Sequence, residues 1–278
     1  MVKVLSESPE IYIFSDGFAS IDGGAMFGIV PKVFWQKHYS ADEKNRVDIA
    51  LNCMLINVND TKVLIDTGIG DKFESKYTEI YKIRKKENLV KHLKGLGLQP
   101  DDIDIVILTH LHFDHCGYNT VVDNGVIKPL FRKARYIVQK SEWEYSVSPD
   151  ERSAASYIKE NFLPLDEFKV LELIDDDIEL KDLGIKIIYT GGHSVGHQSV
   201  LVLCDDKKIF FAGDLFPVGL NLKVNYTSSF DLFPLNVIKK KKEILKIAEQ
   251  ENWVFVLPHE IQYPYGTLQD LQSKFSQQ

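Results

Sequence analysis

The sequence predicts an α/β fold built as a single domain over residues 1–278. Short apolar runs, typical of buried strands, alternate along the chain with stretches of helical apolar spacing. Several of these runs end directly at a histidine or an aspartate. No linker rich in proline, glycine or serine divides the chain, and no repeat of 20 to 50 residues occurs.

The first third of the chain predicts a loop, a hairpin and a helix in that order. Residues 10–35 are rich in glycine and aromatics and predict a long ordered loop near the active site. The strands 54–58 and 62–65 flank a turn at 59–61 and read as a hairpin. Residues 88–98 carry leucines at helical spacing, and Gly95, Gly97 and Pro100 end that helix.

The rest of the chain predicts strands separated by helices. Residues 103–109 form an apolar run typical of a strand buried on both faces. Helices are expected at 153–163 and 234–252, and the lysine run 239–242 on the second is expected to face solvent. Further strands are expected at 134–138, 169–173, 185–190, 200–204, 209–212 and 253–257.

Four of the expected strands end beside a possible metal ligand. Thr109 precedes His110, Thr190 lies shortly before His193, Ala212 precedes Gly213-Asp214, and Leu257 precedes Pro258-His259. Strands that stop at one rim and place polar groups there are typical of α/β active sites. Ligands spread from residue 110 to 259 converge on one rim only if the chain forms one domain.

Composition excludes several classes of protein. The 44% hydrophobic and 26% charged fractions are ordinary for a globular chain. A net charge of −7 argues against a nucleic-acid partner, and no apolar run is long enough to span a membrane. The first 20 residues lack the pattern of a signal peptide. Three widely spaced cysteines suit a reducing compartment, so a cytoplasmic location is expected.

The segment 110–115 holds the densest group of candidate metal ligands. It reads His-Leu-His-Phe-Asp-His, so three of the eight histidines lie within six residues. Imidazole and carboxylate are good ligands for zinc and related divalent ions. On a tight loop, His110 and His112 can serve one metal while Asp114 and His115 serve a second. The later strand ends offer His193, Asp214 and His259, and the two oxygens of Asp214 can bridge two ions.

These motifs together resemble the metallo-β-lactamase superfamily, in its dinuclear hydrolase branch. The resemblance is carried by Asp66-Thr67-Gly68, the 110–115 motif, Gly192-His193, Gly213-Asp214 and Pro258-His259. The segment 23–32 followed by Trp35 is similar to the N-terminal loop of N-acyl homoserine lactonases and of the methyl-parathion-hydrolase-like group. The resemblance implies an αββα sandwich of two mixed sheets flanked by helices.

The resemblance also implies the role of each ligand. His110, His112 and His193 would bind the first divalent ion. Asp114, His115 and His259 would bind the second, with Asp214 bridging. Zinc is the expected metal, and manganese, iron or cobalt suit the same ligands. Asp114 and Asp214 are then also the expected catalytic residues.

Residues around these ligands have two interpretations. Asp66 is expected to orient a ligating imidazole, although a purely structural Asp-Thr-Gly turn fits as well. His197 fits a supporting role better than ligation. Met26, Phe27 and Tyr226 are candidates for the wall of a substrate pocket. For Met26 and Phe27, ordinary core packing is the competing interpretation.

The expected function is a metallo-hydrolase that opens lactones or cleaves related esters with a hydroxide held by two metals. Organophosphate or phosphodiester hydrolysis on the same metals, and a metal-binding protein without catalysis, are the alternatives. The sequence departs from the lactonase pattern at Pro217, where that pattern has a tyrosine. A small-molecule substrate is expected, and the apolar N-terminal loop favours a homodimer in which it covers a partner's site.

Overall fold

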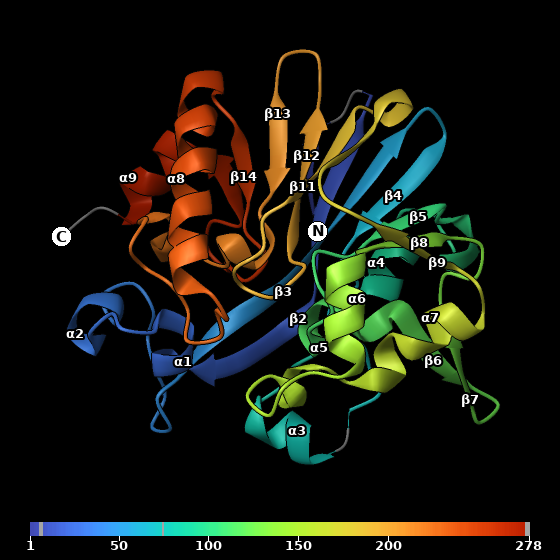
Figure 1. The fold of residues 1–278 in the computed structure, drawn as a ribbon, viewed down its shortest axis with the longest axis horizontal. Helices are drawn as coiled ribbons and strands as arrows, with labels where there is room; N and C mark the ends of the chain where they lie inside the picture. The colour runs from blue at the N-terminus through green and yellow to red at the C-terminus, as the bar shows by residue number, and fades with distance from the viewer. Residues whose placement is uncertain (6–7, 74, 276–278) are drawn as a thin grey trace.

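Two β-sheets pack face to face in the computed structural model, which describes residues 1–5, 8–73 and 75–275 (Figure 1). The first sheet has the strand order β1-β2-β3-β4-β5-β8-β9 and the second the order β10-β11-β12-β13-β14-β15. Both are mixed: the pairs β4–β5, β5–β8 and β8–β9 in the first sheet and the pair β13–β14 in the second are parallel, while the other pairs are antiparallel. A separate hairpin pairs β6 with β7.

The strands of the first sheet are β1 (Val2–Leu5), β2 (Glu10–Asp22), β3 (Arg46–Val58), β4 (Thr61–Ile65), β5 (Ile105–Ile107), β8 (Arg135–Gln139) and β9 (Leu171–Ile174). Those of the second are β10 (Ile178–Leu180), β11 (Ile185–Tyr189), β12 (Gln198–Leu203), β13 (Lys208–Phe211), β14 (Val254–Val256) and β15 (Tyr265–Thr267). The hairpin strands are β6 (Thr120–Asp123) and β7 (Val126–Pro129).

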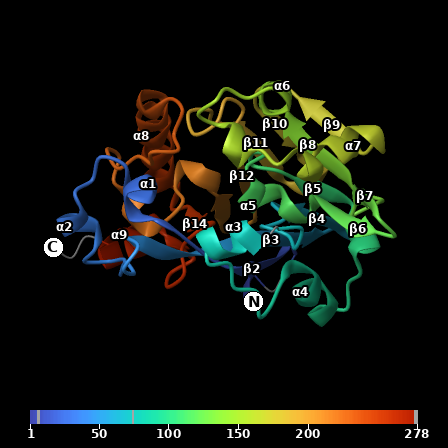
Figure 2. The same cartoon turned by 90° about the horizontal axis from the view of Figure 1, so that it is seen from below.

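Helices cover the outer faces of both sheets, with those of the second sheet on the left and those of the first sheet on the right of Figure 2. The helices are α1 (Gly23–Phe27), α2 (Lys32–Trp35), α3 (Ser75–Ile80), α4 (Leu89–Gly95), α5 (Phe113–Cys116), α6 (Lys140–Val147), α7 (Leu163–Glu167), α8 (Pro234–Glu251) and α9 (Leu268–Phe275). Leucines of α4 and α7 pack on the first sheet, and apolar residues of α8 and α9 pack on the second.

The core between the sheets is aliphatic. Alternate residues of β3 and β4, such as Met54 and Val63, meet residues such as Ile187 and Val200 from β11 and β12. Strands buried on both faces need apolar residues at nearly every position, which is the pattern read from the sequence. The resulting order of layers is helices, sheet, sheet, helices, and the predicted αββα sandwich is confirmed.

The expected loop over residues 10–35 is wrong for its first half. Glu10–Asp22 forms β2, which pairs with β1 and along most of β3. The glycine that suggested a loop, Gly17, has φ of +129° and sits where the register shifts between Ser15 and Phe18. A bulge at a glycine therefore interrupts a long strand without ending it.

Two other expectations are corrected. Residues 153–163 do not form one helix. They form two short 3-10 turns before α7, and this path buries both Tyr157 and Phe162 in the core. Helix α8 does form, but Lys241 in its lysine run is only 1% exposed. Its Nζ donates to the carbonyls of Asn221 and Tyr226, which explains how an ammonium group is accommodated there.

The hairpin expected at 54–65 is confirmed, since β3 and β4 pair antiparallel on either side of Asn59 and Asp60. Both turn residues have positive φ, as the tight turn requires. No helix in the described part of the chain is long and apolar enough to cross a membrane.

Candidate metal centre

The predicted ligands lie together at one edge of the sandwich. The loops that carry them follow β5, β11, β13 and β14, so residues as far apart in the chain as His110 and His259 meet where these strands end. All seven fall into groups whose ligand atoms are close enough to share a cation, with His110 and His115 each in two groups. The structure thus brings together His110, His112, Asp114, His115, His193, Asp214 and His259.

The first group contains His110, His112 and His193. Their ligand atoms all lie within 4.8 Å of one another. Nε2 of His193 is 3.2 Å from Nδ1 of His112. Two nitrogens that carry no hydrogen repel at that distance, whereas a cation between them would be attracted to both lone pairs.

The second group contains Asp114, His115 and His259. Nε2 of His115 lies 3.1 Å from Nε2 of His259. Oδ2 of Asp114 lies 3.6 Å from the His259 nitrogen and 3.9 Å from the His115 nitrogen. This donor set of two imidazoles and one carboxylate suits a divalent transition-metal ion.

Asp214 stands between the two groups. Its Oδ1 is 3.3 Å from Nε2 of His115 and 3.2 Å from Nε2 of His259. Its Oδ2 is 3.4 Å from Nε2 of His193. One carboxylate oxygen thus faces each group, which is the arrangement that a bridging ligand needs.

Two buried atoms of the site have no hydrogen-bond partner. They are Nε2 of His110 and Oδ1 of Asp214. Leaving a buried polar atom unpaired costs about 1–3 kcal/mol, so such atoms are rare in a folded protein. Both point to the place that a cation would fill, and the donor set therefore fits a pair of divalent ions.

Four of the five ligand histidines, His110, His115, His193 and His259, have a partner on the nitrogen that faces away from the site. Nδ1 of His115 is 2.8 Å from Oδ2 of Asp66. Nδ1 of His259 is 2.9 Å from the carbonyl of Ala50 in β3. These acceptors place the ring proton on Nδ1 and leave the Nε2 lone pair facing the site, as second partners of ligating histidines commonly do.

Asp66 also organises the strand end before His110. Its two oxygens accept from the backbone N–H and the hydroxyl of Thr109, at 2.7 and 2.8 Å. The Thr109 hydroxyl lies 3.0 Å from Nδ1 of His110. Asp66 is 1% exposed and has a backbone φ of +57°, a conformation that residues other than glycine rarely adopt. These contacts are the ones that an orienting residue would make.

His197 lies behind the site and contacts the bridging residue through its backbone. Its Nε2 accepts from the N–H of Asp214 at 2.8 Å, and its Nδ1 is 2.5 Å from the Thr190 hydroxyl. Both nitrogens are occupied, so His197 supports the loop. Gly213 makes this approach feasible, since a Cβ there would lie 2.5 Å from Nε2 of His197 and φ is +54°.

The electrostatics of the site favour neutral imidazoles at His110 and His112, whereas the carboxylates of Asp214 and Asp231 outweigh burial at His193 and raise its pKa. Burial lowers the pKa of both His110 and His112 well below the ordinary histidine value, and the neighbouring histidines lower it further. At His115 burial acts in the same direction, but the carboxylates of Asp214, Asp114 and Asp66 outweigh it and raise the pKa. Burial raises the pKa of Asp214, yet the surrounding histidines hold it well below its usual value.

The proposed wall residues occupy different environments. Met26 and Phe27 are buried, and they pack with Trp35, Val47 and others in a cluster at one side of the fold. Tyr226 is half-buried at the edge of that cluster. Pro217, where the lactonase pattern has a tyrosine, is buried and its carbonyl accepts from the N–H of His259 at 2.9 Å.

Asp231 is a site residue that sequence reasoning did not find. Its Oδ1 lies 2.8 Å from Nδ1 of His193, and its Oδ2 accepts from the N–H of Ser228 at 2.9 Å. It therefore orients His193 as Asp66 orients His115. Asp231 is 38 residues from His193 and sits in no recognisable motif, so only the fold reveals it.

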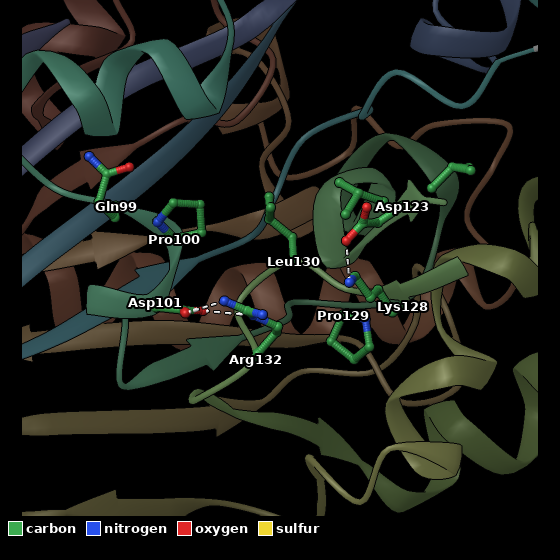
Figure 3. A pocket seen from close by; sticks show the side chains of 10 residues that line it. Gln99, Pro100, Asp101, Asp123, Lys128, Pro129, Leu130 and Arg132 are labelled. Atoms are coloured by element: carbon green, nitrogen blue, oxygen red, sulfur yellow. Dashed lines mark hydrogen bonds and ion pairs between the residues drawn. The ribbon is translucent and has the colours of Figure 1, made fainter. Parts of the chain in front are cut away.

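A polar cavity of about 490 Å³ lies elsewhere on the surface, next to the β6–β7 hairpin (Figure 3). It contains none of the candidate ligands. Its two cationic side chains are paired within the cavity, Arg132 with Asp101 and Lys128 with Asp123. Because these charges cancel, the cavity does not compete with the metal centre as a site of chemistry.

Comparison with known proteins agrees with the metal-binding geometry of the site. Residues 48–259 match the family model described as the metallo-beta-lactamase superfamily. The chain is 28% identical over 243 residues to an N-acyl homoserine lactonase of Bacillus cereus, covering 80% of this chain and 86% of that relative.

Solved structures are similar over almost the whole chain. A probable metal-dependent hydrolase from Staphylococcus aureus is 30% identical, with a TM-score of 0.87 and coverage of 92% of this chain and 91% of that one. AidC, a dizinc quorum-quenching lactonase, has a TM-score of 0.79 and 20% identity, and the match covers 96% of this chain and 92% of that one. At 20% identity, the similarity to AidC shows a shared fold.

Proposed function

This chain belongs to the metallo-β-lactamase superfamily and is a metallo-hydrolase, and from that premise we propose that it opens lactone rings of the N-acyl homoserine lactone type. One observation carries the proposal: the Asp214 carboxylate faces a ligand group on each side, at 3.2–3.4 Å. The lactonase name of relatives that align with 80% of this chain supports the choice of substrate class.

The residues that would hold the metals follow from the two groups. His110, His112 and His193 would hold one ion, and Asp114, His115 and His259 the other, with Asp214 shared. Zinc is proposed for both positions, because imidazole and carboxylate donors suit it. Bound divalent ions lower the pKa of water from about 15.7 to about 7 and polarise a carbonyl oxygen.

The protein contributes orientation and proton transfer. Asp66 and Asp231 fix the rings of His115 and His193 through their Nδ1 atoms. The Asp114 side chain is 18% exposed, so it is accessible to water that enters with the substrate. Asp114 therefore orients that water and takes up its proton on a carboxylate oxygen, as a general base within reach of the reaction does.

Pro217 has a consequence for the leaving group. Because the residue at this position is a proline, it offers no phenol to the substrate. Lactone opening by this chain therefore proceeds without a tyrosine at that position. Phosphotriester hydrolysis, which relies on the same ligands, is the second candidate, and the missing phenol is the observation that favours it.

One panel of substrates separates the two candidates. We expect kcat/KM to be highest for N-acyl homoserine lactones when simple lactones, aryl esters, thioesters and phosphotriesters are measured beside them. A preference for phosphotriesters would assign the second function. Asp114→Asn and Asp214→Asn should each abolish most of the activity, and full activity in both variants would refute the two-metal proposal.

We also propose that two copies of the chain associate through the segment 28–35, and that both act in the cytoplasm. Ile29, Val33 and Phe34 are exposed there by 87%, 56% and 52%. Exposed apolar side chains gathered in one segment are typical of an interface. Sedimentation velocity should show a dimer that Phe34→Glu dissociates, and a monomeric wild-type protein would refute this assembly.

A further inference from the structure

Glu142, in the first turn of α6, is a carboxylate buried at the back of the metal centre. It is 0% exposed. Carboxylates are almost never fully buried unless their oxygens are paired. The identified ligands and their direct partners do not include Glu142, so its burial requires a separate explanation.

Four uncharged donors satisfy its two oxygens. Oε1 accepts from the N–H of Leu111 at 3.0 Å and from the Tyr157 hydroxyl at 3.1 Å. Oε2 accepts from the Ser194 hydroxyl at 2.6 Å and from the N–H of Gly196 at 3.0 Å. The donors belong to two ligand loops and to the turn that contains Tyr157.

The two backbone donors are placed next to metal ligands. Leu111 lies between His110 and His112, and Gly196 lies three residues after His193. One oxygen of Glu142 therefore holds the loop of the first two ligands, and the other holds the loop of the third. These three histidines are the first ligand group, to which Asp114, His115 and His259 do not belong.

Two packing contacts reinforce the connection. A Cβ on Gly196 would lie 2.3 Å from the backbone nitrogen of Glu142, so the loop lies directly against the start of α6. The Tyr157 ring packs edge-on against His112, with ring centroids 5.0 Å apart. Tyr157 thus touches a ligand with its ring and Glu142 with its hydroxyl.

We propose that Glu142 is a positioning residue that sets the spacing of His193 from His110 and His112, and so controls the affinity of the first metal position. It touches neither metal nor substrate and acts through the two loops. This inference rests on the proposed two-metal centre. It adds that the first position has a support of its own, since the two backbone donors to Glu142 adjoin ligands of that group, Leu111 between His110 and His112 and Gly196 after His193.

The substitution Glu142→Gln tests the proposal with little change in shape. The hydroxyls of Tyr157 and Ser194 can rotate and accept from the new amide, but a backbone N–H cannot. In either orientation of the amide, the N–H of Leu111 or that of Gly196 loses its acceptor and faces an N–H group. Glu144→Gln is the matched control, because Glu144 lies on the same helix with 65% of its side chain exposed.

The measurement is a Zn²⁺ titration of chelator-stripped protein against a competing chelator dye. Wild-type protein should show two steps, and the step that His193→Ala removes is assigned to the first group. Glu142→Gln should weaken that step by about tenfold or more and leave the other step within about threefold. Glu144→Gln should change neither step.

Other outcomes overturn the proposal. Two unchanged steps in Glu142→Gln, or an equal weakening of both, would show that Glu142 does not position the first group. If Glu142→Gln does not fold by circular dichroism, Ser194→Ala removes a single donor and should still weaken the first-group step by about threefold. No change there would also refute the proposal. A wild-type protein without two steps refutes the proposed function itself, before any variant is measured.

Discussion

Replacing Lys241 by methionine should change how the stability of the protein depends on pH. Burial lowers the pKa of this lysine to about 8, against an ordinary 10.5, and the charge of Asp231 only partly opposes the shift. Between these two values the unfolded chain binds a proton that the folded chain does not. The free energy of unfolding therefore increases as pH rises from about 8 toward 10.5. Below about pH 8 Lys241 is protonated in both states and contributes no such increase.

The expected size follows from the shift in pKa. Between pH 7 and pH 10 the free energy of unfolding of wild-type protein should rise by about 2.5 kcal/mol relative to Lys241→Met. A neutral amine still carries two hydrogens for the carbonyls of Asn221 and Tyr226, so both bonds survive deprotonation.

Urea unfolding at four pH values, followed by circular dichroism in chelator, measures this difference. Lys242→Met, at an exposed position of the same helix, is the control and should give no trend. A wild-type minus Lys241→Met difference that stays flat, or falls with pH, would refute the reasoning.

Three further predictions concern the supports of the metal centre. Asp231→Ala removes the acceptor of His193 Nδ1 and should weaken one zinc step by about 10–100-fold, whereas an unchanged titration would contradict this role. Asp66→Ala should weaken the other step by a similar factor through His115, and the first step less, through Thr109 and His110; an unchanged second step would contradict this role. Gly213→Ala should lower the free energy of unfolding by about 1–3 kcal/mol, because its Cβ meets His197; an unaltered melting temperature would show that the backbone adapts.

The ligand positions were predictable because their signal is local. A buried apolar run and a dense histidine motif are both read from a few adjacent residues, and β5 does end three residues before His110. The other candidate ligands, His193, Asp214 and His259, were found because each follows an expected strand. Strands that run in the same direction end at the same edge of a sheet.

Asp66 and His197 were expected beside the ligands from the sequence, but Asp231 and Glu142 were not predictable. Asp231 reaches His193 across 38 residues, and Glu142 joins the loop at Leu111 to the loop at Gly196 across 31 and 54 residues. Such contacts depend on how the loops pack, and no spacing in the chain encodes them. The burial of Lys241 was missed for the same reason, because the carbonyls that receive it belong to a loop 15–20 residues away.

The failed expectation at residues 10–22 has a different cause. Glycine and polar residues in that stretch have weak strand propensity, and pairing with β3 overrode it. Long-range pairing decides such segments, and local composition does not contain that information.

The most direct test is the rate of N-acyl homoserine lactone opening as Zn²⁺ is added to chelator-stripped protein. The two ligand groups and the Asp214 carboxylate between them predict a rate that rises and reaches its plateau at two equivalents per chain. An equal rate in stripped protein, or no lactone opening at two equivalents, would contradict the account.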